Sequence, residues 1–318
     1  MSDTTTLQKP SSALLPFRIN ERYYAPILIS LILIVGQVSF HFLTSPTGTA
    51  IGIISSILTE LLMGFLFYRK LPNFASAYVS GISVGILVQS TMVWPYVLCC
   101  IIAILSKYCI RIDKRHLWNP SNLGIVTLLL VAPRYVSTLG AQAGNSMFAM
   151  TIIWIVGSII VYRIKRLHIC LTYVFFFLLY AAFRALILSH YVANESFLQE
   201  AAPITGPMYQ LFIFFMITDP KTTVHSRKGQ MLVAFLVASI ENIFRMYGTL
   251  ASPPDGTLGN IVATHAPYFA LTLMGPSANF IEIMKMKYRL VNANDSAIAA
   301  KNSELSEISV SSSVVSLK

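Results

Sequence analysis

The chain has 318 residues, of which 55% are hydrophobic and only 11% are charged. Soluble domains carry roughly a quarter charged residues, so this composition excludes an ordinary soluble protein. The formal net charge is +10 at pH 7. In a hydrophobic chain this charge has to be tested against the positive-inside rule before nucleic acid is considered as a partner.

Apolar segments long enough to cross a hydrocarbon core of about 30 Å recur along most of the chain. The sequence therefore predicts an all-α, polytopic membrane protein with a cytoplasmic N-terminal tail (1–22), a transmembrane domain (23–288) and a disordered cytoplasmic C-terminal tail (289–318). The tail is Ser-rich and has no sustained apolar run that could offset the entropy of ordering. We expect ten spans, at about 24–44, 48–68, 74–93, 94–110, 120–139, 146–163, 168–189, 203–218, 229–247 and 262–284.

The basic residues predict the orientation of these spans. All but three of the 23 Lys and Arg residues precede the first span or follow an even-numbered one. The positive-inside rule then places both termini in the cytoplasm, as in a multi-pass protein of a bacterial inner (plasma) membrane. The positive charge is mostly a topology signal, so nucleic acid loses its support as a partner.

The three exceptions, Arg134, Arg184 and Arg245, share a depth near the outer boundary of the membrane. One interpretation is that their long side chains extend to the interface, with Arg245 also pairing with Glu241 one helical turn earlier. The other is a basic rim around an outward-facing pocket for an anionic group. The sequence leaves both open.

Glu60 lies within the second expected span, where a carboxylate in hydrocarbon costs a few kcal/mol. Such a group is expected to face the interior of the helix bundle. It either ties two helices together through hydrogen bonds, aided by Thr59 and Ser56, or forms a proton or cation site.

Two segments carry polar and helix-breaking residues where apolar sequence is expected. In HLWNPSNLG (116–124), Asn119 is a predicted N-cap and Pro120 the first helical residue. The second segment runs from Pro203 through an aromatic stretch to ITDPKTT (217–223), where Asp219 and a proline repeat the pattern. Non-helical backbone at membrane depth is tolerated where it is buried in protein or lines a cavity, so the breaks predict half-helices around a site. The alternative is that both mark ordinary cytoplasmic ends of spans.

These motifs resemble NqrB and RnfD, the flavin-carrying membrane subunits of the sodium-pumping NADH:quinone reductase and the Rnf complex. Within that family the chain is similar to a shorter, stand-alone branch, the UnbU-like proteins, over about residues 20–288. The resemblance implies ten transmembrane helices in two five-helix halves, a fold like that of urea transporters, and flavin bound in the membrane. Because the sequence shows no NADH-binding motif and no iron–sulfur ligand set, the chain would need other subunits of a membrane complex as partners, besides lipid.

One departure from the family concerns covalent flavin. The electron-transfer subunits attach FMN to the threonine of an S-G-A-T motif, but the matching region here (136–144) reads VSTLGAQAG, with Gln142 in that place. This argues against covalent FMN and leaves noncovalent FMN or riboflavin, or a quinone. The expected ligand-binding residues are the polar ones of the two breaks: Asn119, Ser121, Asn122, Thr205, Thr218, Asp219 and Thr222. An aromatic slot is expected from Tyr209, Phe212, Phe214, Phe215 and Met216.

The leading functional hypothesis is a redox-associated membrane subunit that moves electrons or ions and is not catalytic on its own. The alternatives are a solute or ion transporter or channel on the same scaffold, with Glu60 and the two breaks as its permeation site, and a structural subunit of a larger complex. The spacing of histidines and cysteines predicts no metal site. His116, beside the first break, is either an exposed loop residue or a proton relay.

Overall fold

The computed structural model describes residues 24–40, 43, 45–72, 74–112, 115–139, 147–191 and 196–315. Within these ranges the fold is all-α, as the sequence predicted, with two short antiparallel strand pairs. In the first pair Val88 lies opposite Thr138, and in the second Arg111 lies opposite His116. The strands are β1 (Val88–Gln89), β2 (Arg111–Ile112), β3 (Arg115–His116) and β4 (Ser137–Thr138).

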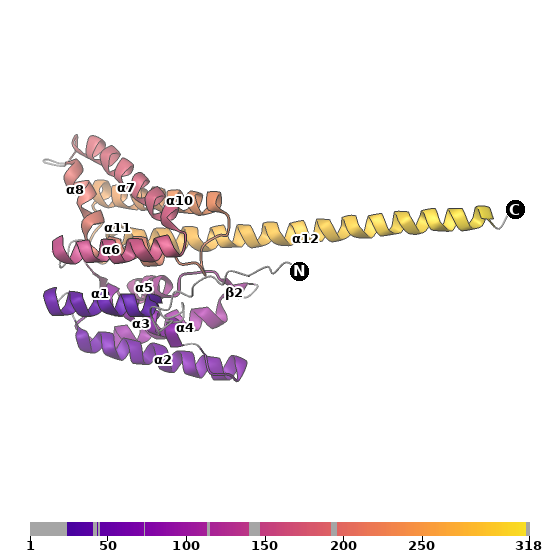
Figure 1. The fold of residues 1–318 in the computed structure, drawn as a ribbon. Coiled ribbons are helices and arrows are strands. Elements are labelled where there is room, and N and C mark those ends of the chain that lie inside the picture. Colours follow the sequence, from indigo (N-terminus) through magenta and orange to yellow (C-terminus); the bar gives the residue numbers. More distant parts are fainter. Residues whose placement is uncertain are drawn as a thin grey trace, which may run out of the picture.

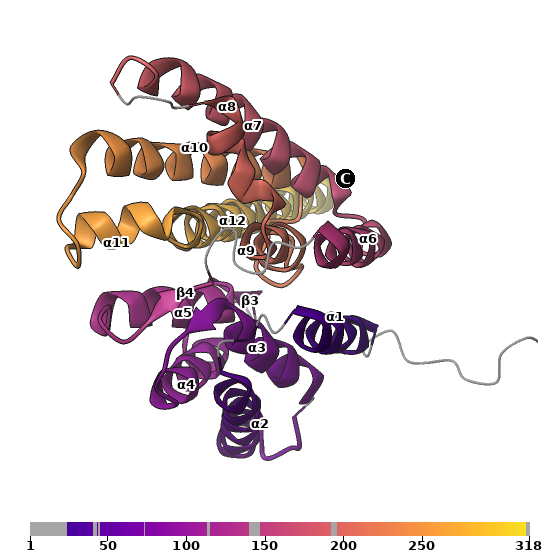
Figure 2. The same ribbon diagram turned by 90° about the vertical axis from the view of Figure 1, so that its left-hand side faces the viewer.

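The first half of the chain forms five helices, which lie together in Figure 2. They are α1 (Tyr24–Phe40), α2 (Pro46–Tyr68), α3 (Phe74–Leu87), α4 (Trp94–Cys109) and α5 (Pro120–Val131). Helix α2 packs on α3 and α4, α4 packs on α5, and α1 packs on α3.

The second half contains longer helices and one interrupted segment. The long helices are α6 (Met147–Arg163), α7 (Leu167–Leu188), α10 (Arg227–Ala251) and α12 (Ala266–Val315), with the short α11 (Leu258–Thr264) before α12. The interrupted segment consists of α8 (Phe197–Ala201), η2 (Ala202–Thr205), α9 (Pro207–Leu211) and the π-helical turn η3 (Phe212–Met216). Helix α7 packs on α8 and α10, α10 packs on α12, and α6 packs on α9.

The two halves therefore repeat one order of contacts, with α7, the interrupted segment, α10 and α12 in the places of α2, α3, α4 and α5. They meet where α1 contacts α6 and where α5 contacts α11 and α12. Helices α2, α7 and α10 are long and apolar enough to cross a membrane, and shorter apolar helices accompany them. That the chain crosses the membrane ten times and has both termini in the cytoplasm stays a prediction.

Small residues let α2 and α3 approach closely. A Cβ added to Gly81 would lie 2.8 Å from the Cα of Ile53, so no larger residue fits there without a shift of the backbone. Two hydroxyls of α2 then reach carbonyls of α3, Thr49 Oγ1 to Gly85 O at 3.0 Å and Ser56 Oγ to Ala77 O at 2.8 Å. Small residues and interhelical hydrogen bonds are the usual means of holding helices together in lipid.

The predicted C-terminal tail (289–318) falls mostly within helix α12, and its disorder stays a prediction. Helix α12 continues through Val315, and its last part projects away from the bundle (Figure 1). The sequence there mixes strong helix formers such as alanine, leucine and glutamate with many serines, valines and asparagines. The region lacks an apolar core-forming face, a feature that bears on packing and not on helix formation.

Candidate functional site

The first break builds a capped helix start, as the sequence predicted. Asn119 has extended backbone, its side chain accepts a hydrogen bond from the amide of Asn122 at 3.1 Å, and Pro120 begins α5. Because the cap uses Oδ1, the amide nitrogen of Asn119 is left to point elsewhere. It lies 3.5 Å from Asp219 Oδ2 and 3.4 Å from the carbonyl oxygen of Met216, both in the second break.

The second break is a turn and not a helix start. Asp219 accepts hydrogen bonds from the amide of Lys221 at 3.0 Å and from the hydroxyl of Thr222 at 3.1 Å. Helix α10 begins later, at Arg227, with Ser226 as its N-cap. The expectation that Asp219 caps a helix is therefore wrong, because its carboxylate closes the local turn first, as aspartate readily does.

The two breaks meet at a cavity of about 440 Å³ that we call the inter-half cavity. Helices α1, α3, α4 and α5 supply its walls on one side, and α6, η3 and the following turn supply them on the other. Its polar lining comprises Ser76, Ser80, Ser83, Lys107, His116, Asn119, Ser121, Thr218, Asp219 and Lys221, and its apolar lining includes Ile160, Ile164, Phe214, Phe215 and Met216.

Four of the seven predicted ligand-binding residues line this cavity, namely Asn119, Ser121, Thr218 and Asp219. Thr222 does not line it and instead holds the carboxylate of Asp219 in place. Thr205 lies at the end of η2, where its hydroxyl bonds to the carbonyl oxygen of Ala202 at 2.7 Å, so the structure does not bring it to the site.

Asn122 points away from the cavity and joins the two halves. Its amide nitrogen donates to the carbonyl oxygen of Tyr268 at 3.0 Å and to Thr272 Oγ1 at 2.7 Å, both on α12. Pro276, inside α12, has no backbone N–H to donate to the carbonyl of Thr272 four residues earlier. The indole nitrogen of Trp118 donates to that carbonyl at 3.0 Å instead. Contacts from the first break thus fill the gap that the proline leaves.

The expected aromatic slot forms in part. Phe214, Phe215 and Met216 line the inter-half cavity. Phe212 is buried against Tyr173 and Tyr268, and the hydroxyl of Tyr209 bonds to Glu241, so neither joins the lining. A π-helical turn changes which side chains face a given side, and the sequence pattern of this stretch did not reveal it.

Glu60 faces the protein interior, as expected, but its partners differ from those predicted. Tyr108 donates to Glu60 Oε1 at 2.9 Å, and Lys107 Nζ lies 3.7 Å from Glu60 Oε2. Thr59 and Ser56 instead bond to backbone carbonyls of Ser55 and Ala77. Because Lys107 also lines the inter-half cavity, the charge of Glu60 is coupled to that cavity. The sequence did not reveal the contact between Lys107 and Glu60, because Lys107 stands at the end of an apolar segment, where a positive charge is read as a topology signal.

His116 is half-buried in β3 and lines the same cavity. Burial and the nearby cations, chiefly Lys221, lower the pKa of His116 to about 4, so its imidazole is neutral at pH 7. Its Nδ1 is buried without a hydrogen-bond partner in the described residues. The expectation of an exposed loop histidine is wrong, and the residue offers an unused polar atom beside the first break.

The three outer arginines do not line one pocket. Arg184 is 1% exposed and forms an ion pair with Glu200 at 2.6 Å. Arg245 lies 3.2 Å from Glu200 and 3.9 Å from Glu241, which confirms the predicted pairing along α10. Arg134 is exposed in the turn after α5. A basic rim is therefore wrong as a description, because carboxylates neutralise two of the arginines.

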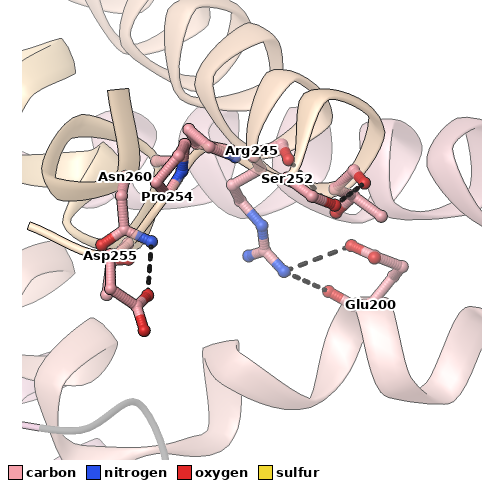
Figure 3. Close-up of a pocket in the computed structure, with 11 residues that line it drawn as sticks. Glu200, Arg245, Ser252, Pro254, Asp255 and Asn260 are labelled. Atoms are coloured by element: carbon pink, nitrogen blue, oxygen red, sulfur yellow. Dashed lines mark hydrogen bonds and ion pairs between the residues drawn. The ribbon is translucent and has the colours of Figure 1, made fainter. Parts of the chain in front are cut away.

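Arg245 and Glu200 instead share a mixed-charge pocket of about 620 Å³, the Glu200 pocket. Figure 3 shows Arg245 reaching toward Glu200, with Asp255 and Asn260 bonded to each other nearby, at 3.3 Å. The sequence signal for Glu200 was weak, since it lies in a short polar stretch between two expected spans.

Comparison with known proteins adds no identification, because neither a scan of family models nor a search of curated proteins gave a match. Of the region that would carry covalent FMN (136–144), residues 140–144, with Gln142, lie outside the described residues. The described residues contain no cluster of three or more His, Cys, Asp or Glu suited to a metal ion. The arrangement is a partly open site with an apolar aromatic wall and a few convergent polar groups.

Proposed function

We propose that this chain is a multi-pass protein of a bacterial inner membrane that binds a planar redox ligand, a noncovalent flavin or a quinone, in the inter-half cavity. It would act in electron or ion movement as one subunit of a larger complex. The observation that carries the proposal is the meeting of the two breaks. Asn119 and Asp219, 100 residues apart in sequence, lie 3.5 Å apart at the wall of the cavity.

The size and lining of the cavity suit a small organic ligand. Its volume of about 440 Å³ falls within the range of roughly 300–1,000 Å³ typical of ligand pockets, which are mostly apolar with a few placed polar groups. Phe214 and Phe215 line the cavity and would contact an aromatic ligand. Asn119, Ser121 and Asp219 would bind its polar edge, while the bound ligand would supply the redox chemistry.

The ligand class and the need for partners come from the resemblance to NqrB and RnfD. The repeated order of contacts in the two halves agrees with the two-half architecture of that family. The sequence shows no dinucleotide-binding motif, so electrons would be delivered by another subunit.

The test is to purify the full chain in mild detergent and record its absorbance spectrum, with acid release for flavin and solvent extraction for quinone. We expect one of the two at a stoichiometric amount, reduced in Asp219→Ala and retained in Thr205→Ala, which alters a predicted residue away from the cavity. A colourless protein with no extractable quinone, prepared together with its co-purifying partners, would overturn the proposal.

A transporter or channel is the second candidate, and the contact between Glu60 and Lys107 favours it. An ion pair beside a cavity between two repeated halves is the arrangement expected at a transport site. The test is to reconstitute the purified protein in liposomes and measure uptake of ions or protons. A transporter would show uptake and no bound cofactor, and Glu60→Gln would abolish the uptake. A protein with bound cofactor and no such uptake would exclude this candidate.

A further inference from the structure

A third cavity, which we call the basic cavity, lies between the α6–α7 turn and the start of α10 and has a volume of about 790 Å³. Its lining contains no Asp or Glu. The basic residues that line it are Arg163, Lys165, Arg166, His168, His225 and Arg227. Neither the redox hypothesis nor the transport hypothesis uses this site.

The walls of the basic cavity are fixed by backbone and side-chain hydrogen bonds. Lys165 adopts a left-handed conformation (φ 58°), which reverses the chain, and the amide of Arg166 bonds to the carbonyl oxygen of Val161 at 3.0 Å. His168 Nε2 lies 2.6 Å from Gln230 Oε1, which ties the start of α7 to the start of α10. A non-glycine residue held in this conformation is strained and persists only where the surroundings enforce it.

The cations of this cavity are not neutralised within the part of the chain that the structure describes. Arg163, Lys165, Arg166 and Arg227 form none of its ion pairs, and Arg166 Nη1 is buried without a hydrogen-bond partner. Burial, together with repulsion from Arg115, lowers the pKa of Arg166 despite attraction from Asp219. Of the titratable lining residues, His225 bonds to a carboxylate, that of Glu282 at 3.2 Å.

Two helix starts add to the positive potential. Helix α7 has no side-chain cap at its N-terminus, and α10 has basic residues but no acidic one in its first turn. Cations at a helix N-terminus are unfavourable because the helix dipole is positive there. A bound anion would offset both the dipole and the clustered cations.

The expected topology places the basic cavity at the cytoplasmic surface of the membrane. Tyr162, 73% exposed, and the half-exposed Leu167 give its edge the amphipathic character typical of headgroup level.

We infer that the basic cavity binds a phosphate group, with Arg166 and Arg227 as principal donors. The group comes either from the headgroup of an anionic phospholipid or from free phosphate, since guanidinium groups recognise both in the same way.

The experiment measures binding of two probes to the full-length protein in neutral detergent. Radiolabelled inorganic phosphate is tested by equilibrium dialysis, and phosphatidylglycerol by native mass spectrometry against phosphatidylcholine. The double variant Arg166→Gln/Arg227→Gln is compared with Lys70→Gln/Lys285→Gln, which removes the same charge at exposed positions outside the cavity lining. Because the charge of Arg166 is partly buried, which is unfavourable, we expect the cavity variant to melt at or above the wild-type temperature.

We expect the Arg166→Gln/Arg227→Gln variant to bind at least about tenfold more weakly to whichever probe the wild type binds, as loss of a charge-assisted hydrogen bond predicts. The control variant should bind as the wild type does. Preferential binding of phosphatidylglycerol identifies a lipid headgroup as the source of the bound phosphate, and binding of inorganic phosphate identifies the free ion. Binding of neither probe, or an equal loss in the control variant, would overturn the inference. Arg166→Lys/Arg227→Lys keeps the charge and should retain part of the binding.

Discussion

The two halves of the molecule bury charge in different ways. In the first half, α2 and α4 hold one carboxylate, Glu60, whose Oε2 lies 3.7 Å from Lys107 and lacks a hydrogen-bond partner. In the second half, α7 and α10 hold a network in which Glu200 pairs with two arginines and each oxygen of Glu241 accepts a tyrosine hydroxyl. Among the described residues, each cluster contains one buried atom without a hydrogen-bond partner, Glu60 Oε2 in the first and Arg184 Nη2 in the second, so hydrogen bonding alone does not separate them. The clusters differ in position, because Lys107 lines the inter-half cavity whereas Arg184 does not. We therefore assign the second cluster to stability and the first to function.

The largest expected effect is on the second cluster. Glu200→Leu leaves Arg184 buried without a carboxylate, and arginine cannot shed its charge. We expect the free energy of unfolding to fall by about 3–5 kcal/mol, measured by thermal unfolding in detergent. Glu200→Leu/Arg184→Met, which removes both charges, should recover much of the loss. An unchanged melting temperature in the single variant would refute the assignment to stability.

Lys107→Met tests the first cluster in the same way. The change leaves Glu60 without its cation, but the hydroxyl of Tyr108 still donates a hydrogen bond to the carboxylate. We therefore expect a smaller loss of stability, about 1–3 kcal/mol, together with reduced ligand content because Lys107 lines the inter-half cavity. A loss equal to that of Glu200→Leu with normal ligand content would mean that both clusters serve stability alone.

Asn119 has two roles, capping α5 and contacting Asp219, and two substitutions separate them. Asn119→Ala removes the helix cap and the bond to Asp219, so stability should fall by about 1 kcal/mol and ligand content should also fall. Asn119→Ser keeps a capping oxygen but has no amide to reach Asp219, so only ligand content should fall. Chemical unfolding and absorbance of the same preparations distinguish these outcomes. Normal ligand content in both variants would remove Asn119 from the site.

The smallest expected effect concerns Thr59. Its hydroxyl bonds to the carbonyl oxygen of Ser55 and not to Glu60, so Thr59→Val should change stability by less than about 0.5 kcal/mol and leave ligand content or transport unchanged. A clear functional loss would show that Thr59 does assist Glu60 and that the partners of the first cluster need revision.

Helix positions and the capped start of α5 could be predicted because they depend on local signals. Apolar runs fixed the helices to within a few residues in most cases, and Asn119 followed by Pro120 is a strong start signal. The sequence predicted that Asn119 and Asp219 belong to one site, but it did not predict their direct contact. It depends on how the two halves pack, and no local pattern encodes that.

Partners across the bundle could not be predicted. Lys107 reads as a topology signal in the sequence, and only the packing of α2 on α4 shows that it meets Glu60. Likewise, the sequence is consistent with Arg184 and Arg245 as interfacial residues. In the structure the interrupted segment places Glu200 where it pairs with both. Long charged side chains have the same sequence signature whether they end in water or in an ion pair.

Pro276 has a consequence for how the molecule assembles. The proline leaves an acceptor on α12 that a residue of the other half, Trp118, satisfies. A buried carbonyl without a donor is costly, so α12 would be incomplete until the earlier helices dock against it. Helix α12, which is synthesised after those helices, therefore completes its hydrogen bonding only when they are in place, and two separately expressed fragments should associate through that contact.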